Sequence, residues 1–310
     1  MADKPVHTYS PIAGIALGLV LILCLLTGTK QGFAQNDAQG QQVAILISKH
    51  IKPYMEAAAG LEEYLQDQGG AVRIILFAEK NEFQKEQLTQ ELRENSYQAA
   101  VGIGPQAMEF LWAQPDLGIP IVFSMVLHPE QLVTENSPPL CGVTLSLPVD
   151  IQLRSIEDFL PGRSGIGLLF HPEHNQELYL QAAQTVKDTD RRIVPLAISE
   201  QGDIPDLLAN HLGQIDALWL IPDQALTSQK VVEYIIKQAL YAKVPVIGYN
   251  RFFHQSGAAI SFVFDYDRIG RQTGRVLMRR LTSTWCEVVP ADFEVWENDQ
   301  VFDLLGLDDE

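Results

Sequence analysis

The sequence is poor in basic residues and lacks the common catalytic motifs. Its 310 residues include 22 lysines and arginines against 39 aspartates and glutamates, a net charge of −17. This balance argues against nucleic acid or an anionic membrane surface as a partner, since both are polyanions. No Gly-x-Ser-x-Gly elbow and no His-Glu-x-x-His motif occurs. The nearest metal-like cluster, His171-Pro-Glu-His174, has the spacing of a loop. We therefore expect no enzyme, no cofactor and no bound metal.

Cysteine is scarce as well, with three residues in the chain. Cys24 lies inside an apolar run and follows Leu23, which is not the small residue that a lipoprotein signal needs. Cys141 and Cys286 remain, and an exported protein can oxidise such a pair. The sequence does not place them within bonding distance, so we expect two unrelated buried thiols, with a disulfide as the alternative.

The N-terminus has the pattern of a signal peptide. A weakly basic start with Lys4 precedes the apolar run 12–26, and the small residues Gly32 and Ala34 follow it. The run is about 15 residues long, short of the roughly 20 that span a bilayer. We predict a signal peptide over 1–34, cleaved after Ala34, which would place the protein in the periplasm. An uncleaved membrane anchor is the alternative.

The rest of the chain alternates short apolar runs with longer amphipathic stretches, after a polar, flexible leader at 35–41. The runs lie at 43–48, 72–78, 99–104 and 119–124, and again at 165–170, 192–198, 217–221 and 245–250. Nearly continuous apolar strands separated by helices indicate parallel sheets covered on both faces. Two similar sets predict an α/β protein of two Rossmann-like lobes joined by a hinge, because a chain of this length seldom folds around a single hydrophobic core.

The boundary between the lobes is predicted near the segment CGVTLSLP, after the helix-breaking Pro138-Pro139. A helix at 268–281 follows the second set, and a strand-like segment, FEVWEN, comes after it. We expect these late elements to cross back between lobes. The predicted N-terminal lobe is 42–145 plus 265–286, and the predicted C-terminal lobe is 146–264 plus 287–310.

Several segments, taken in order, resemble one family of transport proteins. They are AAVGIGPQA, GIPIVFSMVLHPEQLV, CGVTLSLPVDIQL, LPGRSGIGLLFHPEHN, DALWLIPDQAL, KVPVIGYN, DYDRIGRQTG and FEVWENDQVFDLLGL. Together they cover about 42–307 and are similar to the ABC transporter substrate-binding proteins of tryptophan and tyrosine importers. The resemblance implies a type I periplasmic binding protein fold with a ligand between the lobes. The chain departs from the family pattern at His128, where Asp is usual, and at His171, where Asn is usual.

Candidate binding residues follow from the rule that ligands of open α/β sheets sit beyond the carboxyl ends of the strands. The residues at those ends are Ser48, Gly104, Pro105, Phe123, Ser124 and Met125 in the first set, and His171, Asn175, Pro222, Asp223, Tyr249 and Asn250 in the second. Asp265 lies at the expected return crossing. Apart from Met125 and Pro222, we expect all of the strand-end residues to contact ligand, and Asp265 is a further candidate.

Several candidates also have a structural interpretation. Free N–H groups after Gly104-Pro105 would suit a ligand carboxylate, but the pair would equally make a tight turn. Asp223 would bind an ammonium or hydroxyl group, or cap the next helix. Asp265 is expected to cap the helix at 268, with a ligand contact as the alternative.

For the aromatic and histidine candidates, the sequence likewise allows a binding role and a structural role. Phe123 and Tyr249 would stack on an apolar ligand or pack in the core. His128 and His171 would contact a carboxylate or lie solvated in loops. The segment 270–274, GRQTG, has the composition of a phosphate loop but lacks its Gly-Lys-Ser/Thr ending, and we predict helix there.

These observations favour a monomeric solute-binding protein that passes a small molecule to an ABC permease with its ATPase. The resemblance implies that the small molecule is an amino acid. The alternative is a sensor module that reports the ligand to a membrane signalling protein. An enzyme is disfavoured by the missing nucleophile–base pattern. A repressor is disfavoured by the exported N-terminus and by the lack of a helix-turn-helix.

Overall fold

The computed structural model describes residues 7–9, 42–77, 80–94, 97–114, 116–135 and 137–307. They form two compact units. The N-terminal lobe contains the described residues from 42 to Ser146 and Asp265–Asp292, and the C-terminal lobe contains Leu147–Phe264 and the described residues from Phe293. The expected signal peptide (apart from 7–9) and the leader lie outside the described residues. No described helix is long and apolar enough to cross a membrane.

The N-terminal lobe is built on a parallel sheet with the order β12-β6-β5-β4-β2-β3. Its strands are β2 (Gln42–Ile47), β3 (Ala71–Leu76), β4 (Tyr97–Ile103), β5 (Ile121–Val126), β6 (Gly142–Thr144) and β12 (Val288–Pro290). The sequence suggested a last crossing at 286/287. The chain instead crosses after Asp292, because β12 pairs with β6 and stays in this lobe.

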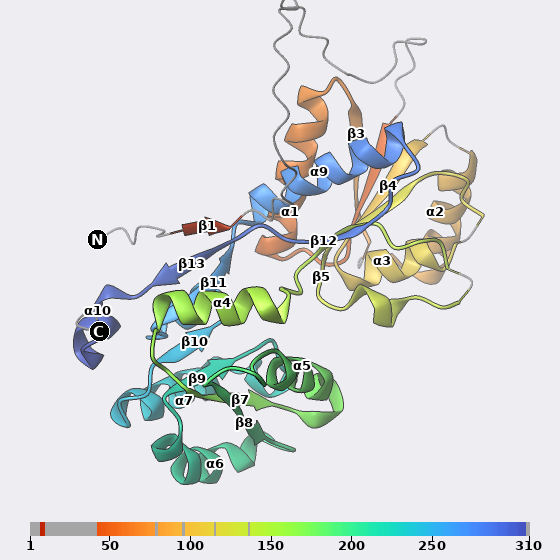
Figure 1. The fold of residues 1–310 in the computed structure, drawn as a ribbon. Coiled ribbons are helices and arrows are strands. Elements are labelled where there is room, and N and C mark those ends of the chain that lie inside the picture. Colours follow the sequence, from red (N-terminus) through yellow and green to blue (C-terminus); the bar gives the residue numbers. More distant parts are fainter. Residues whose placement is uncertain are drawn as a thin grey trace, which may run out of the picture. The chain divides into compact units, whose positions relative to one another are not determined.

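Helices cover both faces of this sheet (Figure 1). They are α1 (Lys52–Asp67), α2 (Glu82–Glu94), α3 (Pro105–Trp112) and α9 (Tyr266–Thr282), with a 3₁₀ turn at Pro129–Leu132. Helices α2 and α3 bring Leu88, Leu92 and Met108 into the core on one side. On the other side α1 lies against α9, whose predicted helical conformation is confirmed.

A disulfide joins Cys141 to Cys286, with their Cα atoms 5.0 Å apart. The expectation of two unrelated thiols was therefore wrong. The bond lies beside the β6–β12 pair, where Val288 is opposite Gly142. Residues separated by 145 positions meet here because α9 returns the chain to the N-terminal lobe, which the local sequence pattern does not reveal.

The C-terminal lobe has a mixed sheet with the order β1-β13-β11-β10-β9-β7-β8. Its strands are β1 (His7–Tyr9), β7 (Gly165–Phe170), β8 (Arg192–Ala197), β9 (Ala217–Leu220), β10 (Val246–Gly248), β11 (Ile260–Phe264) and β13 (Phe293–Glu297). The five strands from β7 to β11 are parallel, and β13 runs antiparallel to β11 and β1. The FEVWEN segment thus forms a strand of this lobe.

Helices again lie on both faces. They are α4 (Val149–Phe159), α5 (Pro172–Thr185), α6 (Ile204–His211), α7 (Gln229–Tyr241), α8 (Arg251–Gln255) and α10 (Asp299–Leu305), with 3₁₀ turns at Gln201–Asp203, Leu212–Gln214 and Gln224–Leu226. One core is formed by α4, α5 and α10 against the sheet, and the other by α6, α7 and α8. The predicted α/β class is confirmed.

The two lobes repeat one topology. Five consecutive parallel strands of the N-terminal lobe, β2 to β6, have the spatial order β3-β2-β4-β5-β6, and the parallel strands β7 to β11 of the C-terminal lobe have the order β8-β7-β9-β10-β11. In each, the first strand lies between the second and the third, so the strand order reverses there. Such a reversal is where ligands bind in open α/β sheets.

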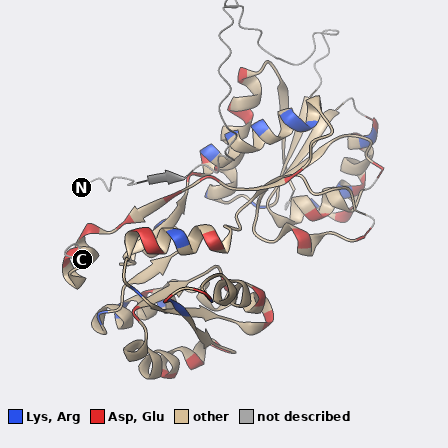
Figure 2. Ribbon diagram, viewed as in Figure 1, with Lys and Arg blue, Asp and Glu red and all other residues tan. Residues whose placement is uncertain are grey.

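Acidic side chains occur on many helices of both lobes, whereas basic ones are conspicuous along α9 (Figure 2). Arg271 of that helix pairs with Glu63 and with Asp267, the latter at 2.9 Å. These contacts hold the pKa of Glu63 below its usual value. The arginines of α9 therefore serve in part to neutralise acids of their own lobe.

Candidate functional site

The reversal point of the N-terminal lobe lies between β2 and β4, and three predicted residues meet there. Ser48 follows β2 and is fully buried. Its Oγ accepts a hydrogen bond of 2.8 Å from the N–H of Ala107, in the first turn of α3. Gly104 precedes that helix with φ of 86°, and Pro105 begins it. Ser48 thus accepts a hydrogen bond from one of the N–H groups that the sequence predicted to be free for a ligand carboxylate.

Tyr54 adds an aromatic wall to this end of the lobe, which sequence reasoning missed. A Cβ on Gly104 would lie 2.7 Å from a ring carbon of Tyr54 and 2.9 Å from the Cβ of Ser48. Gly104 is therefore required both by its φ and by this close contact. Burial raises the pKa of Tyr54, so the phenol stays protonated at neutral pH. Tyr54 lies in the first turn of α1, not at a strand end, so the rule for strand ends does not select it.

Phe123 and Ser124 lie inside the lobe. Phe123 is fully buried and packs edge-on against Trp112, with ring centroids 6.0 Å apart. Ser124 is also fully buried, with its Oγ 2.7 Å from the Oγ1 of Thr273. Because Thr273 donates its proton to the carbonyl of Ile269, Ser124 acts as the donor. Core packing, the structural alternative for Phe123, describes that side chain, and Ser124 is equally buried, so we leave both out of the binding set.

The next residue, Met125, has a strained backbone. Its φ is 60°, which is uncommon for a side chain of this kind, and the pairing of β5 with β6 shifts register there. Such strain costs about 1–3 kcal/mol and often occurs at functional sites. The shift turns the following loop, which carries His128.

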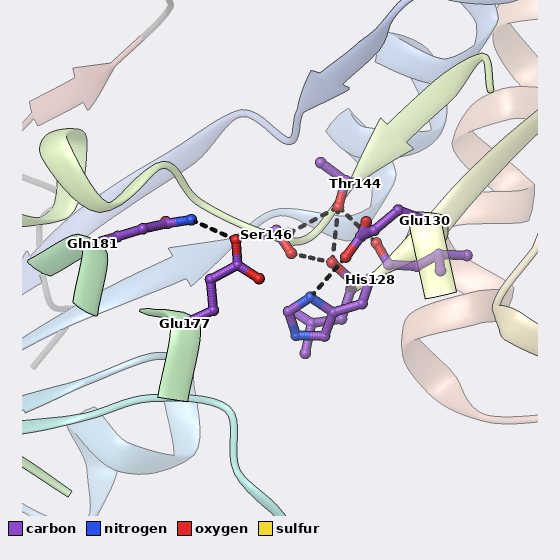
Figure 3. A network of polar contacts seen from close by, with 8 residues as sticks. His128, Glu130, Thr144, Ser146, Glu177 and Gln181 are labelled. Atoms are coloured by element: carbon purple, nitrogen blue, oxygen red, sulfur yellow. Dashed lines mark hydrogen bonds and ion pairs between the residues drawn. The ribbon is translucent and has the colours of Figure 1, made fainter. Parts of the chain in front are cut away.

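That loop is held by the end of β6 (Figure 3). Thr144 Oγ1 lies 2.9 Å from the carbonyl of Val126 and 3.1 Å from that of Leu127, and Ser146 also donates to Leu127. His128 Nδ1 lies 3.4 Å from a carboxylate oxygen of Glu130. His128 is half-exposed, as expected of a loop histidine, and its backbone position is fixed by these contacts.

The reversal point of the C-terminal lobe lies between β7 and β9, and Asp223 is its centre. Its Oδ2 accepts from the N–H of His171 at 2.8 Å and from Nδ2 of Asn175 at 2.7 Å. Its Oδ1 accepts from the N–H of Ala225 at 2.9 Å. Both Asp223 and Asn175 are buried. Three predicted residues thus form one network that joins the ends of the two strands.

Asn175 interrupts α5 to reach this network. Its φ of −128° and ψ of 15° are not helical, and its amide also donates to the carbonyl of Pro222 at 3.2 Å. His171 caps the same helix, since its Nδ1 accepts from the N–H of Glu173 at 3.2 Å. Farther along α5, Gln181 donates to Glu177 at 3.3 Å (Figure 3).

Tyr249, after β10, lies close to Asp223. Burial and, to a lesser extent, the charge of Asp223 raise the pKa of Tyr249 to about 12, so its hydroxyl remains a donor at neutral pH. The ring lies 4.3 Å from that of Phe253, centroid to centroid, and is partly buried. Asn250 caps α8 by accepting from the N–H of Phe253 at 3.2 Å.

Asp265 is exposed and caps α9, where it accepts from the N–H of Arg268 at 3.1 Å. Asp265 thus makes the helix cap that the sequence predicted. As the first residue of the N-terminal lobe after a crossing, it also fixes where α9 begins.

The Asp223 network makes a stability prediction. In Asp223→Asn, an NH₂ group replaces one accepting oxygen and faces a donor, so the variant should lose about 1–2 kcal/mol of unfolding free energy. The urea midpoint, followed by circular dichroism, measures this. Asp188→Asn, at an exposed turn, is the matched control. Equal midpoints for both variants would contradict a structural role for the carboxylate.

Comparison with known proteins agrees with this architecture. The sequence profile of a family described as ABC transporter substrate binding protein matches residues 42–302. No curated protein matches the chain. Among solved structures, a ligand-free, open substrate-binding protein with adhesive properties from Clostridium difficile has 18% identity and a TM-score of 0.72, covering 86% of this chain and 95% of its own.

Two further structures share the fold. An ABC domain from Streptococcus pneumonia in complex with L-Trp has 16% identity and a TM-score of 0.60, over 86% of this chain and 95% of its own. An ABC sugar transporter subunit from Rhodobacter sphaeroides has 14% identity and a TM-score of 0.53, over 84% and 98%. The predicted type I periplasmic binding protein fold is confirmed.

Proposed function

Because this chain belongs to the ABC transporter substrate binding protein family, we propose that it captures a small molecule outside the cytoplasmic membrane and delivers it, as a monomer, to an ABC permease with its ATPase. The observation that carries this proposal is the repeated topology. Both lobes place polar and aromatic side chains at the reversal of strand order, where ligands of such sheets bind.

The proposed binding residues come from both lobes. They are Ser48, Tyr54, Gly104 and Pro105 on the N-terminal lobe, and His171, Asn175, Asp223, Tyr249 and Asn250 on the C-terminal lobe, with Asp265 at the crossing. Closure of the lobes around a ligand would be a hinge motion, and the ligand drives it by binding the closed state more tightly. A permease that recognises the closed shape then distinguishes loaded from empty protein.

An amino acid is the ligand class that these groups suit best. At the start of α3 the N–H of Gln106 is available to a carboxylate, because Pro105 has no N–H and Ala107 donates to Ser48. Tyr54 and Tyr249 offer aromatic faces and protonated hydroxyls. Asp223 accepts three hydrogen bonds, one fewer than its oxygens accommodate, which leaves room for an ammonium group. The L-Trp complex of the streptococcal relative supports this choice.

The proposal predicts thermal stabilisation by the ligand. A matching amino acid at 100 times its Kd adds about 2.7 kcal/mol to the native state, which should raise Tm by roughly 5–10 °C. Differential scanning fluorimetry of the purified chain against amino acids and small organic acids, with EDTA present, measures this. No shift with any compound would overturn the binding proposal.

Variants locate the site. Tyr249→Ala should weaken the Kd of the identified ligand about tenfold or more, as measured by calorimetric titration, because it removes the ring beside Asp223. Tyr241→Ala, a tyrosine 72% exposed on α7, should leave the Kd unchanged.

Delivery is tested separately: the loaded protein should stimulate ATP hydrolysis by a permease encoded beside it. A neighbouring sensor kinase without a permease would favour the sensor alternative.

A further inference from the structure

A second feature lies at the start of α5, beside the Asp223 network. His171, Glu173 and His174 each present a ligand atom, and these atoms all lie within 4.8 Å of one another. The two imidazole rings are 5.0 Å apart between centroids and tilted by 33°. The spacing of these residues suggested a loop, but the structure makes His171 the cap of α5 and places Glu173 and His174 in its first turn.

The backbone under this cluster is firmly held. The N–H of His171 donates to Asp223 at 2.8 Å, and its carbonyl accepts from Asn175 at 2.9 Å and from His174 at 3.1 Å. Pro172, between the two ends of the cluster, fixes its own φ. The three side chains therefore start from a defined backbone, and binding a cation would cost them side-chain rotamer entropy alone.

The donor set selects a class of cation. Two imidazole nitrogens with one carboxylate suit zinc and its neighbours cobalt, nickel and copper, whereas calcium and magnesium prefer oxygen ligands. Bond lengths of about 2.0–2.2 Å require ligand atoms within about 4 Å of each other, somewhat closer than here. Glu173 and His174 are exposed, so small rotations of their side chains would close that gap.

Two effects oppose a cation here, and both are modest. The start of a helix carries partial positive charge, worth about 0.3–1 kcal/mol at an exposed position, and the carboxylates of Glu173 and Asp223 lie nearby to offset it. Coordination through Nδ1 of His171 would replace its hydrogen bond from Glu173 N–H, which is long at 3.2 Å. A coordination bond is the stronger of the two.

We propose that His171, Glu173 and His174 bind a late first-row divalent cation, of which zinc is the representative, at the carboxyl end of β7. Three protein ligands leave at least one coordination position for water or for a donor group of a bound molecule. The site stands on its own geometry and does not depend on the proposed transport function.

The test is calorimetric titration of the purified chain with zinc chloride, using an affinity tag without histidine and keeping the disulfide oxidised. Wild type should bind one Zn²⁺ saturably. His174→Ala should weaken the Kd by at least about tenfold, since the loss of an outer-shell partner alone costs that much. Glu173→Gln should weaken it several-fold. His50→Ala, an exposed histidine of the other lobe, should leave it unchanged.

A spectroscopic readout separates coordination from loose association. Co²⁺ in the same site should give visible d–d absorption in wild type and in His50→Ala, and this absorption should be lost in His174→Ala. Both substituted side chains at the site are exposed, so circular dichroism spectra should match wild type. Binding no tighter than about 1 mM in wild type, or an equal Kd in wild type and His174→Ala, would overturn the site. Neither result bears on amino-acid binding, which is measured with EDTA present.

Discussion

Replacing Gly270 with valine should destabilise the N-terminal lobe by about 4 kcal/mol or more. A Cβ at this position would lie 2.0 Å from the carbonyl oxygen of Ala57 and 2.7 Å from the amide nitrogen of Leu61. Both are backbone atoms of α1, so no side-chain rotation relieves the clash. The two helices would have to separate, and the apolar residues between them would lose contacts.

The effect is measured by urea unfolding, followed by circular dichroism and by the transitions seen in calorimetry. Ala59→Val, at an exposed position on α1, is the matched control, because it adds a β-branched residue to a helix without a clash. It should cost less than about 1 kcal/mol. If Gly270→Val had the same midpoint as this control, the close approach of α9 to α1 would be disproved.

Gly270 belongs to the GRQTG segment, for which the sequence predicts helix. The segment lies inside α9, as predicted. Its second glycine, Gly274, faces the ring of Tyr64, which a Cβ would approach to 2.2 Å, and Gly60 on α1 faces the backbone of Asp267 in the same way. The glycines let two helices pack closely. This packing accounts for both glycines without a phosphate loop.

Reducing the disulfide should cost about 2–5 kcal/mol of unfolding free energy, the second large effect that we expect. Cys141 and Cys286 are 145 positions apart, and the entropic stabilisation of a cross-link grows with the length of the loop that it closes. This loop contains the whole of Leu147–Phe264, so the gain is smaller if the C-terminal lobe remains folded while the other lobe unfolds.

Urea midpoints with and without a phosphine reductant measure this cost. The double variant Cys141→Ala, Cys286→Ala should resemble reduced wild type, and the reductant should not affect it further. Identical midpoints for oxidised and reduced wild type would contradict the expected contribution. The bond also holds β6 to β12, which lead into the crossings after Ser146 and Asp292. Reduction should therefore raise amide exchange in both strands.

The sequence predicts the position of the candidate site more accurately than which side chains face it. Ser48, Gly104, His171 and Asp223 follow strands whose apolar runs are easily recognised, and the structure places them at the two reversal points. Phe123 follows the same rule, yet it packs in the core. Whether a residue at a strand end faces the core or the surface depends on the register and on the helices above it, which a local pattern does not specify.

The sequence by itself determined the α/β class, most of the strands and the repeat of the two lobes, because hydrophobic periodicity is a local property of the chain. Only the tertiary structure decided that the two cysteines pair, that Asp223 is satisfied by three donors, and that His171, Glu173 and His174 converge at a helix start. Each of these depends on backbone geometry or on contacts between distant segments. Such contacts are fixed by the return of α9 and by the strand order, not by neighbouring residues.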